Sequence, residues 1–62
     1  MKEFDWVELI VDKEKYKKEG VHKGMVGIIA YDKCIDGEWL VVFDYKIDIS
    51  IKETDLKVIM RK

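Results

Sequence analysis

The amino-acid sequence predicts an all-β fold, a single domain of residues 1–62 in which five short strands form a small barrel. Five apolar segments show the alternation or the β-branched content typical of strands, and short connections join the last four. A chain of 62 residues buries only about 60% of the surface that it exposes when unfolded, so one core is all that it can build. Five short strands avoid exposed edges by closing into a barrel.

The first two predicted strands contain most of the chain's glycines between or within them. Trp6–Asp12 alternates, with Val7 and Leu9 on one face, and predicts the first strand. Gly24–Asp32 is almost continuously apolar and predicts the second. Within it, Gly27 is expected to allow a bulge or a close approach between backbones. We therefore interpret these glycines as features of the fold rather than as a phosphate-binding loop, since no Lys-Ser or Lys-Thr follows them.

A long loop separates these two strands. Its segment Lys13–Gly20 is rich in lysine and glutamate and predicts one or two helical turns. Asp12 is expected to cap the turn and Gly20 to end it. So short a helix is marginal alone, so we expect the packing of Tyr16 to hold it.

The last three strands follow in quick succession. The segments Gly37–Asp44, Lys46–Glu53 and Leu56–Met60 predict them, with a turn at Asp36-Gly37 and a 3₁₀ turn at Glu53–Asp55. The third strand has three alternating residues that we assign to the core: Trp39, Val41 and Phe43.

Charge and residue types restrict the class of protein. Twelve Lys and Arg stand against 13 Asp and Glu, for a net charge of −1, which argues against a chain that coats nucleic acid. The single Cys34 makes no internal disulfide, which fits a reducing compartment. No apolar run approaches the roughly 20 residues that span a bilayer, and Met1–Asp12 lacks the features of a signal peptide. We expect a cytoplasmic protein with no membrane partner.

The chain contains few side chains of the types that form catalytic sites. Cys34 and His22 are the conceivable nucleophile and base, yet they flank the second strand at opposite ends, roughly 25–30 Å apart at ~3.3 Å per residue. One His, one Cys and scattered carboxylates lack the paired spacing of a zinc site. We therefore expect no enzymatic activity, no metal, no cofactor and no small-molecule substrate.

The spacing of apolar residues, glycines and aspartates follows a family pattern. The matching positions are Val7, Leu9, Asp12, Gly20-Val21, Gly24, Gly27, Ile29, Trp39, Val41, Phe43 and Asp55-Leu56. This pattern resembles a family of small bacterial SH3-like proteins, domain of unknown function 4926, and its Gly-x-x-Gly spacing is similar to the KOW motif of ribosomal and transcription-factor barrels. The resemblance covers almost the whole chain and implies an SH3-like barrel, but no activity. The loop Asp12–Gly24 is longer than in the family pattern, so a function special to this chain is expected there.

Apolar residues left over after the core is assigned point to a binding surface. The candidate partner-binding residues are Trp6, Ile10, Leu40 and Val42, which fall on the faces opposite the core residues. An exposed apolar patch is uncommon on a monomer, and the roles open to these residues are closing the ends of the barrel, pairing with a second copy or receiving a partner. We therefore expect a non-catalytic protein-interaction module that binds a protein partner or itself, with an immunity or inhibitor role as one form of this hypothesis.

The lysine-rich loop supports an alternative hypothesis. Its candidate nucleic-acid-binding residues are Lys13, Lys15, Lys17, Lys18 and Lys23, which with two glutamates give residues 13–23 a net charge of +3. Lysines hold phosphates without reading sequence, and the one arginine of the chain leaves few base-specific contacts. The alternative is a KOW-like barrel that contacts RNA or ribonucleoprotein non-specifically.

Overall fold

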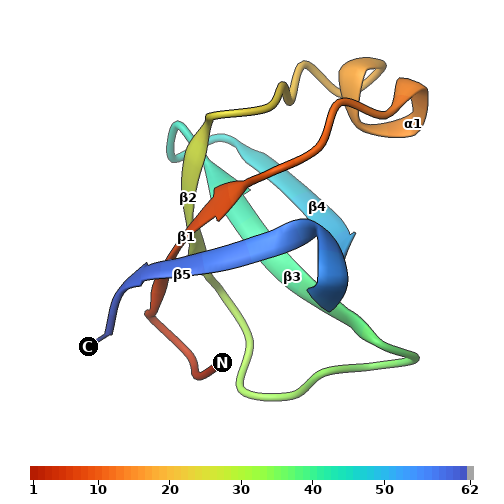
Figure 1. The fold of residues 1–62 in the computed structure, drawn as a ribbon. Helices are drawn as coiled ribbons and strands as arrows, with labels where there is room; N and C mark the ends of the chain where they lie inside the picture. The colour runs from red at the N-terminus through yellow and green to blue at the C-terminus, as the bar shows by residue number, and fades with distance from the viewer. Residues whose placement is uncertain (62) are drawn as a thin grey trace.

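A computed structural model describes residues 1–61, which form five strands, one turn of α-helix and one 3₁₀ turn (Figure 1). The strands are β1 (Trp6–Leu9), β2 (Val26–Ile29), β3 (Glu38–Phe43), β4 (Ile47–Lys52) and β5 (Leu56–Met60). The helical turns are α1 (Glu14–Lys17) and η1 (Glu53–Asp55). The prediction of a mostly β fold is confirmed, and so are the helical turn in the first loop and the 3₁₀ link.

All pairs of neighbouring strands are antiparallel and belong to one sheet, in the order β4-β3-β2-β1-β5. The sheet is strongly bent, and β5 crosses in front of β3 in Figure 1. Within residues 1–61, β4 and β5 are the two edges and do not pair with each other. The hydrogen bonding therefore gives an open five-stranded sheet, and closure into a barrel is not shown.

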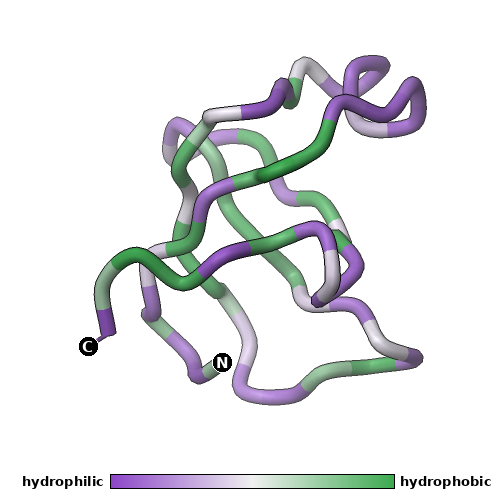
Figure 2. The backbone as a smooth tube through the Cα atoms, viewed as in Figure 1, coloured by the Kyte–Doolittle hydropathy of each residue, from purple (hydrophilic) through white to green (hydrophobic). Residues whose placement is uncertain are grey.

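The core lies on the concave face of the bent sheet. Its buried residues are Val7, Leu9, Tyr16, Val21, Ile29, Trp39, Val41, Phe43, Ile51 and Leu56. Eight of them come from alternating positions of the strands, because successive side chains of a strand point to opposite faces. The other two are Tyr16 of α1 and Val21 of the loop that follows it. The predicted core residues Trp39, Val41 and Phe43 are confirmed as buried. Figure 2 shows hydrophobic and hydrophilic colours alternating along the strands, whereas α1 is mainly hydrophilic.

Gly27 lets β2 and β3 lie close together. A Cβ atom at this position would come within 2.7 Å of the Val42 carbonyl oxygen and 2.7 Å of Val41 Cγ1. Real Cβ contacts are not that short, so any larger residue requires the two strands to move apart. The prediction of a close backbone approach at Gly27 is therefore confirmed. Since Gly27 faces the core, its neighbours Val26 and Ile28 face the outside.

The predicted turn before β3 is also present. Asp36 and Gly37 have φ angles of 52° and 77°, as the central residues of a type I′ turn require. The flanking Ile35 and Glu38 exchange two backbone hydrogen bonds, both 2.9 Å long.

One prediction about the first loop is wrong. Asp12 does not cap α1: the residue before the helix is Lys13, and no side chain caps the turn. The Asp12 carboxylate instead accepts a hydrogen bond of 2.9 Å from the backbone N–H of Lys23. Asp12 thereby ties the start of the loop to its end, since the donor that it satisfies lies 11 residues away.

A buried polar cluster attaches α1 to the sheet. The Tyr16 hydroxyl donates a 2.7 Å hydrogen bond to Asp55, and the Lys13 ammonium forms a 2.9 Å ion pair with the same carboxylate oxygen. Tyr16 also accepts a 3.3 Å hydrogen bond from the backbone N–H of Lys52, at the end of β4. This cluster explains why a helix of four residues is stable here, as the prediction for Tyr16 requires.

Candidate functional site

The outward faces of β1, β2 and β3 form one apolar surface. The strand register places Trp6 beside Ile28 and Ile28 beside Val42, so these three residues make a row across the sheet. The row continues to Met60 on β5, which lies beside Trp6 and is exposed. The core is on the other face, so this surface is not needed to fill it.

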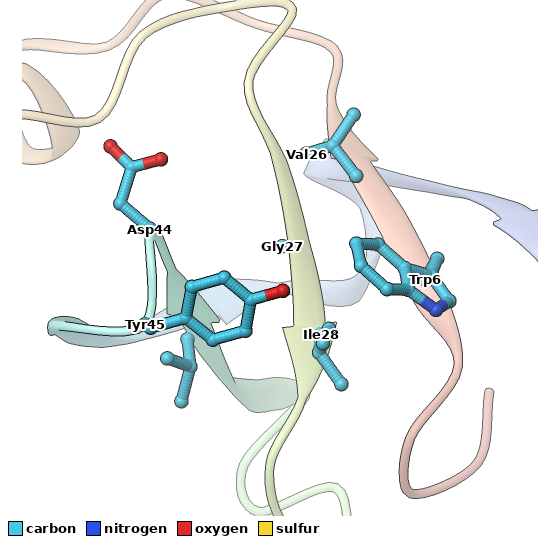
Figure 3. Close-up of a pocket in the computed structure, with 7 residues that line it drawn as sticks. Trp6, Val26, Gly27, Ile28, Asp44 and Tyr45 are labelled. Atoms are coloured by element: carbon cyan, nitrogen blue, oxygen red, sulfur yellow. The ribbon is translucent and has the colours of Figure 1, made fainter.

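A pocket of about 150 Å³ opens on this surface. It is lined by Trp6, Val26, Gly27, Ile28, Val42, Asp44 and Tyr45. Figure 3 shows Trp6 and Tyr45 on opposite sides of β2, with Val26 and Ile28 between them. The pocket therefore has two aromatic walls and a floor of aliphatic side chains, and its size suits one side chain of a ligand rather than a large molecule.

The turn that carries Tyr45 is strained. It joins β3 to β4, and its hydrogen bond from the Lys46 N–H to the Phe43 carbonyl is 3.1 Å long. The φ angles of Asp44 and Tyr45 are 55° and 59°, in the left-handed region that costs a residue with a side chain roughly 1–2 kcal/mol. The Tyr45 side chain is 83% exposed, so burial does not offset this cost. Strain of this kind gathers at functional sites.

Asp44 supplies the pocket's charge. It is the one acidic or basic residue among the seven that line the pocket, and within residues 1–61 it takes part in no ion pair. In Figure 3 the Asp44 side chain points away from the Tyr45 ring, so its carboxylate does not lie between the two aromatic side chains. Lys46 follows Tyr45 in the turn and Asp48 lies beside Val42 on β4, and both are exposed. The lining of the pocket is thus mainly apolar, and its one charged residue is an aspartate.

The structure brings together part of the predicted partner-binding set. Trp6 and Val42 line the pocket. Leu40 is 36% exposed and lies on the same face of β3, two residues from Val42. Ile10 is also exposed but lies beyond the end of β1, where its backbone N–H donates to the Asp55 carbonyl. Ile10 therefore belongs to the η1 end of the molecule and not to the pocket.

Sequence reasoning missed five of the seven lining residues, of which Gly27 was assigned to the fold alone. Val26 and Ile28 lie in a segment that is apolar on both faces, so alternation does not separate inside from outside there. Their direction follows only once Gly27 is known to face the core. Asp44 and Tyr45 occupy a tight turn whose conformation required the structure. The signal available in the sequence was a tyrosine at a turn position where glycine or asparagine is usual.

The predicted nucleic-acid-binding lysines divide into two groups. Lys13 is partly buried and its charge is paired with Asp55. Lys15 is exposed and its ammonium lies 5.2 Å from the centre of the Tyr16 ring. The others, Lys17, Lys18 and Lys23, are exposed. Four of the five lysines are therefore on the surface near α1.

The cluster around Asp55 has perturbed pKa values. Burial alone would raise the pKa of the Asp55 carboxyl, but the hydrogen bonds from Lys13 and Tyr16 outweigh it, and the net effect holds the pKa below its usual 3.8. Burial and the hydrogen bond to Asp55 raise the pKa of Tyr16 from 10.0 to about 12. At neutral pH the Asp55 carboxyl is therefore charged and the Tyr16 phenol neutral, which are the forms that their hydrogen bond requires.

The remaining reactive side chains lie apart from the pocket. Cys34 and His22 are both exposed, in the loops on either side of β2. Within residues 1–61, no group of three or more His, Cys, Asp and Glu side chains is placed to hold a metal ion. Over the same residues, no helix is both long and apolar enough to cross a bilayer.

The site belongs to a small, mostly β protein with an exposed aromatic pocket on its sheet. No protein-family model, no curated protein and no solved structure matches the chain.

Proposed function

We propose that this chain is a non-catalytic interaction module, and that its outer sheet face binds a segment of a partner protein with apolar and cationic side chains. The observation that carries the proposal is the pocket lined by Trp6 and Tyr45, whose other side chains are aliphatic except for that of Asp44. The SH3-like barrel is part of the same proposal. It is supported by the order of the strands along the chain and by the 3₁₀ turn before β5.

The exposure of the aromatic walls supports binding rather than folding as their role. Trp6 is 36% exposed and Tyr45 83% exposed. Aromatic residues are enriched among those that dominate binding energy, because they present a large rigid surface. The continuation of the apolar surface to Leu40 on one side and Met60 on the other gives an extended segment further contacts.

A displayed library of random linear peptides tests the proposal. Peptides are selected on the wild-type protein and then compared on a Tyr45→Ser variant, which removes one wall of the pocket. The matched control is Tyr31→Ser, because Tyr31 is an exposed tyrosine that does not line the pocket. We expect selected peptides to share apolar and basic residues, to lose binding with Tyr45→Ser and to retain it with Tyr31→Ser.

Two results would contradict the proposal. One is a selection in which no peptide prefers the wild-type protein over Tyr45→Ser. The other is a dimer in light scattering that forms at micromolar concentration and disappears in Tyr45→Ser, since the surface would then be occupied by a second copy of the chain.

Non-specific RNA binding is a second candidate, favoured by the exposure of Lys15, Lys17, Lys18 and Lys23 near α1. A mixed-sequence single-stranded RNA is titrated at two salt concentrations. Lysine contacts to phosphate make affinity fall steeply with salt, with a slope of about −0.7 per contact for single strands. A triple charge reversal, Lys15→Glu, Lys17→Glu and Lys18→Glu, should abolish binding.

The matched control is a triple charge reversal at Lys33, Lys46 and Lys57. Equal losses of RNA affinity in the two triple variants would eliminate this function, and so would the absence of binding at low salt.

A further inference from the structure

We infer that the pocket between Trp6 and Tyr45 binds a quaternary ammonium group, carried on a trimethylated lysine side chain of the partner. This inference rests on the proposed function and specifies the chemistry that its pocket recognises. The starting point is the composition of the pocket: two aromatic walls, three aliphatic side chains and one carboxylate.

The charge of the lining selects a cation. Asp44 is the one charged residue that lines the pocket, and no basic side chain lines it. The faces of aromatic rings are electronegative and attract cations, most strongly for tryptophan. An anion would meet the electronegative ring faces and the negative charge of the lining residue Asp44, and is therefore disfavoured.

The scarcity of hydrogen-bonding groups then selects a methylated cation. A lysine ammonium has three N–H donors and an arginine guanidinium has five, and each unpaired donor is costly once it leaves water. The side-chain hydrogen-bond acceptors in the lining are the Asp44 carboxylate and the Tyr45 hydroxyl, since the Trp6 indole N–H only donates. A quaternary ammonium has no donor to satisfy and a surface of methyl groups, which suits the aliphatic floor. The pocket volume of about 150 Å³ accommodates one such group.

The conformation of the β3–β4 turn supports a binding role for the Tyr45 ring. Tyr45 has a φ of 59°, where glycine is the more stable residue. In the other tight turn, the equivalent second position is Gly37, with a φ of 77°. The chain therefore retains an exposed aromatic ring at a position where the backbone favours glycine, and this ring is a wall of the pocket.

Tetramethylammonium and the N-acetyl, N-methylamide derivative of trimethyllysine are the probes. Binding is followed by backbone amide NMR shifts and by the indole N–H shifts of the two tryptophans. The Trp6 indole lines the pocket, whereas the Trp39 indole is buried and donates a 2.7 Å hydrogen bond to Glu53, so Trp39 serves as an internal control. We expect shifts at Trp6, Gly27 and Tyr45 and none at Trp39.

A neutral compound of the same shape as choline tests whether the positive charge, rather than the shape, is recognised. The compound 3,3-dimethylbutan-1-ol replaces the nitrogen of choline by carbon, and we expect it to bind about tenfold more weakly than choline, since two aromatic walls contribute to cation binding. Asp44→Asn should weaken binding of the cation and leave the isostere unchanged. The matched control is Asp36→Asn, because Asp36 is also an exposed aspartate with a left-handed φ in a hairpin turn, but lies outside the pocket.

Each of the other possible results would overturn one part of the inference. Equal binding of the isostere and choline would overturn the cation specificity while leaving the interaction surface intact. Choline binding more tightly than the trimethyllysine derivative would overturn the protein-borne source. No shift at Trp6 with any probe would overturn the ligand assignment, although peptides selected in the library experiment would still support the interaction module. Binding of tetramethylammonium without any selected peptide would retain the pocket and eliminate the protein partner.

Discussion

Replacing Tyr16 by Phe tests how the first loop is attached to the sheet. Phe fills the same space, so the change removes the hydroxyl and leaves no cavity. The hydroxyl donates a 2.7 Å hydrogen bond to a buried carboxylate and accepts a weaker one of 3.3 Å from Lys52. A hydrogen bond to a charged group contributes about 1.5–3 kcal/mol to the free energy of unfolding.

This loss is large for so small a domain, since a core of this size supplies roughly 3–5 kcal/mol. Urea denaturation at pH 7, followed by tryptophan fluorescence, measures it. Tyr31→Phe is the control, because Tyr31 is exposed and its hydroxyl has no hydrogen bond within residues 1–61. A free energy of unfolding for Tyr16→Phe within about 0.5 kcal/mol of the wild type would refute the reasoning, since that is the range of ordinary surface substitutions.

The same variant has a distinct signature at alkaline pH. Burial and the hydrogen bond to Asp55 raise the pKa of Tyr16 to about 12 in the folded protein. Between pH 10 and 12 the unfolded chain loses a phenol proton that the folded chain keeps, so stability falls as the pH rises through this window. A difference of about 2 pKa units corresponds to about 3 kcal/mol. Other groups titrate in both proteins, so the wild-type and Tyr16→Phe curves should converge as the pH approaches 12. Parallel curves would contradict the assignment.

Three further predictions follow from named contacts. Gly27→Ala should lower the free energy of unfolding by about 1–3 kcal/mol in urea titrations, because its Cβ meets the Val42 carbonyl oxygen at 2.7 Å; an unchanged urea midpoint would show that the two strands separate freely. Tyr45→Gly should raise the free energy of unfolding by about 0.5–1 kcal/mol, since relief of left-handed strain exceeds the entropy cost of glycine, and it should abolish tetramethylammonium binding in the NMR titration. Asp55→Asn should be less stable than the wild type at pH 7 but lose less stability in acid: the folded pKa of Asp55 lies below 3.8, so its contribution is present above that value and is lost as the pH falls through the folded pKa. Equal slopes of the two acid limbs would exclude this role.

The sequence predicted the elements of the fold well because their signals are local. The alternation in Lys46–Glu53 marks β4 within one residue at each end, and the three residues of η1 fall where the short link between strands was expected. The cap of α1 was wrong because a more distant donor, the Lys23 N–H, takes the Asp12 carboxylate. Local patterns contain no information about such a competitor.

Only two of the seven residues that line the pocket were predictable, for the same reason. Trp6 and Val42 were identified by alternation within their own strands. Their meeting in one pocket depends on the register that places Ile28 between them, which is a property of three strands together. Ile10 satisfied the same local criterion as Trp6, yet the chain leaves β1 before it and carries it to the η1 end. Alternation therefore reports which side of its own strand a residue occupies, but not which residues lie beside it.

The sheet has two tight turns, and comparing them shows which backbone strain is needed to reverse the chain and which comes only from placing Tyr45 at the pocket. Both turns have an aspartate at the first central position, with φ angles of 52° and 55°. They differ at the second, where Gly37 occupies one turn and Tyr45 the other. If turning the chain were the only requirement, glycine would serve in both turns. Tyr45 lowers the stability of the fold by roughly 1–2 kcal/mol through backbone strain, and its exposed ring gains no burial that would offset this loss. In a domain whose core supplies roughly 3–5 kcal/mol, that cost is a substantial fraction of the total. A role for the ring in binding explains its retention, and the opposite effects expected of Tyr45→Gly on stability and on binding follow from this single difference between the turns.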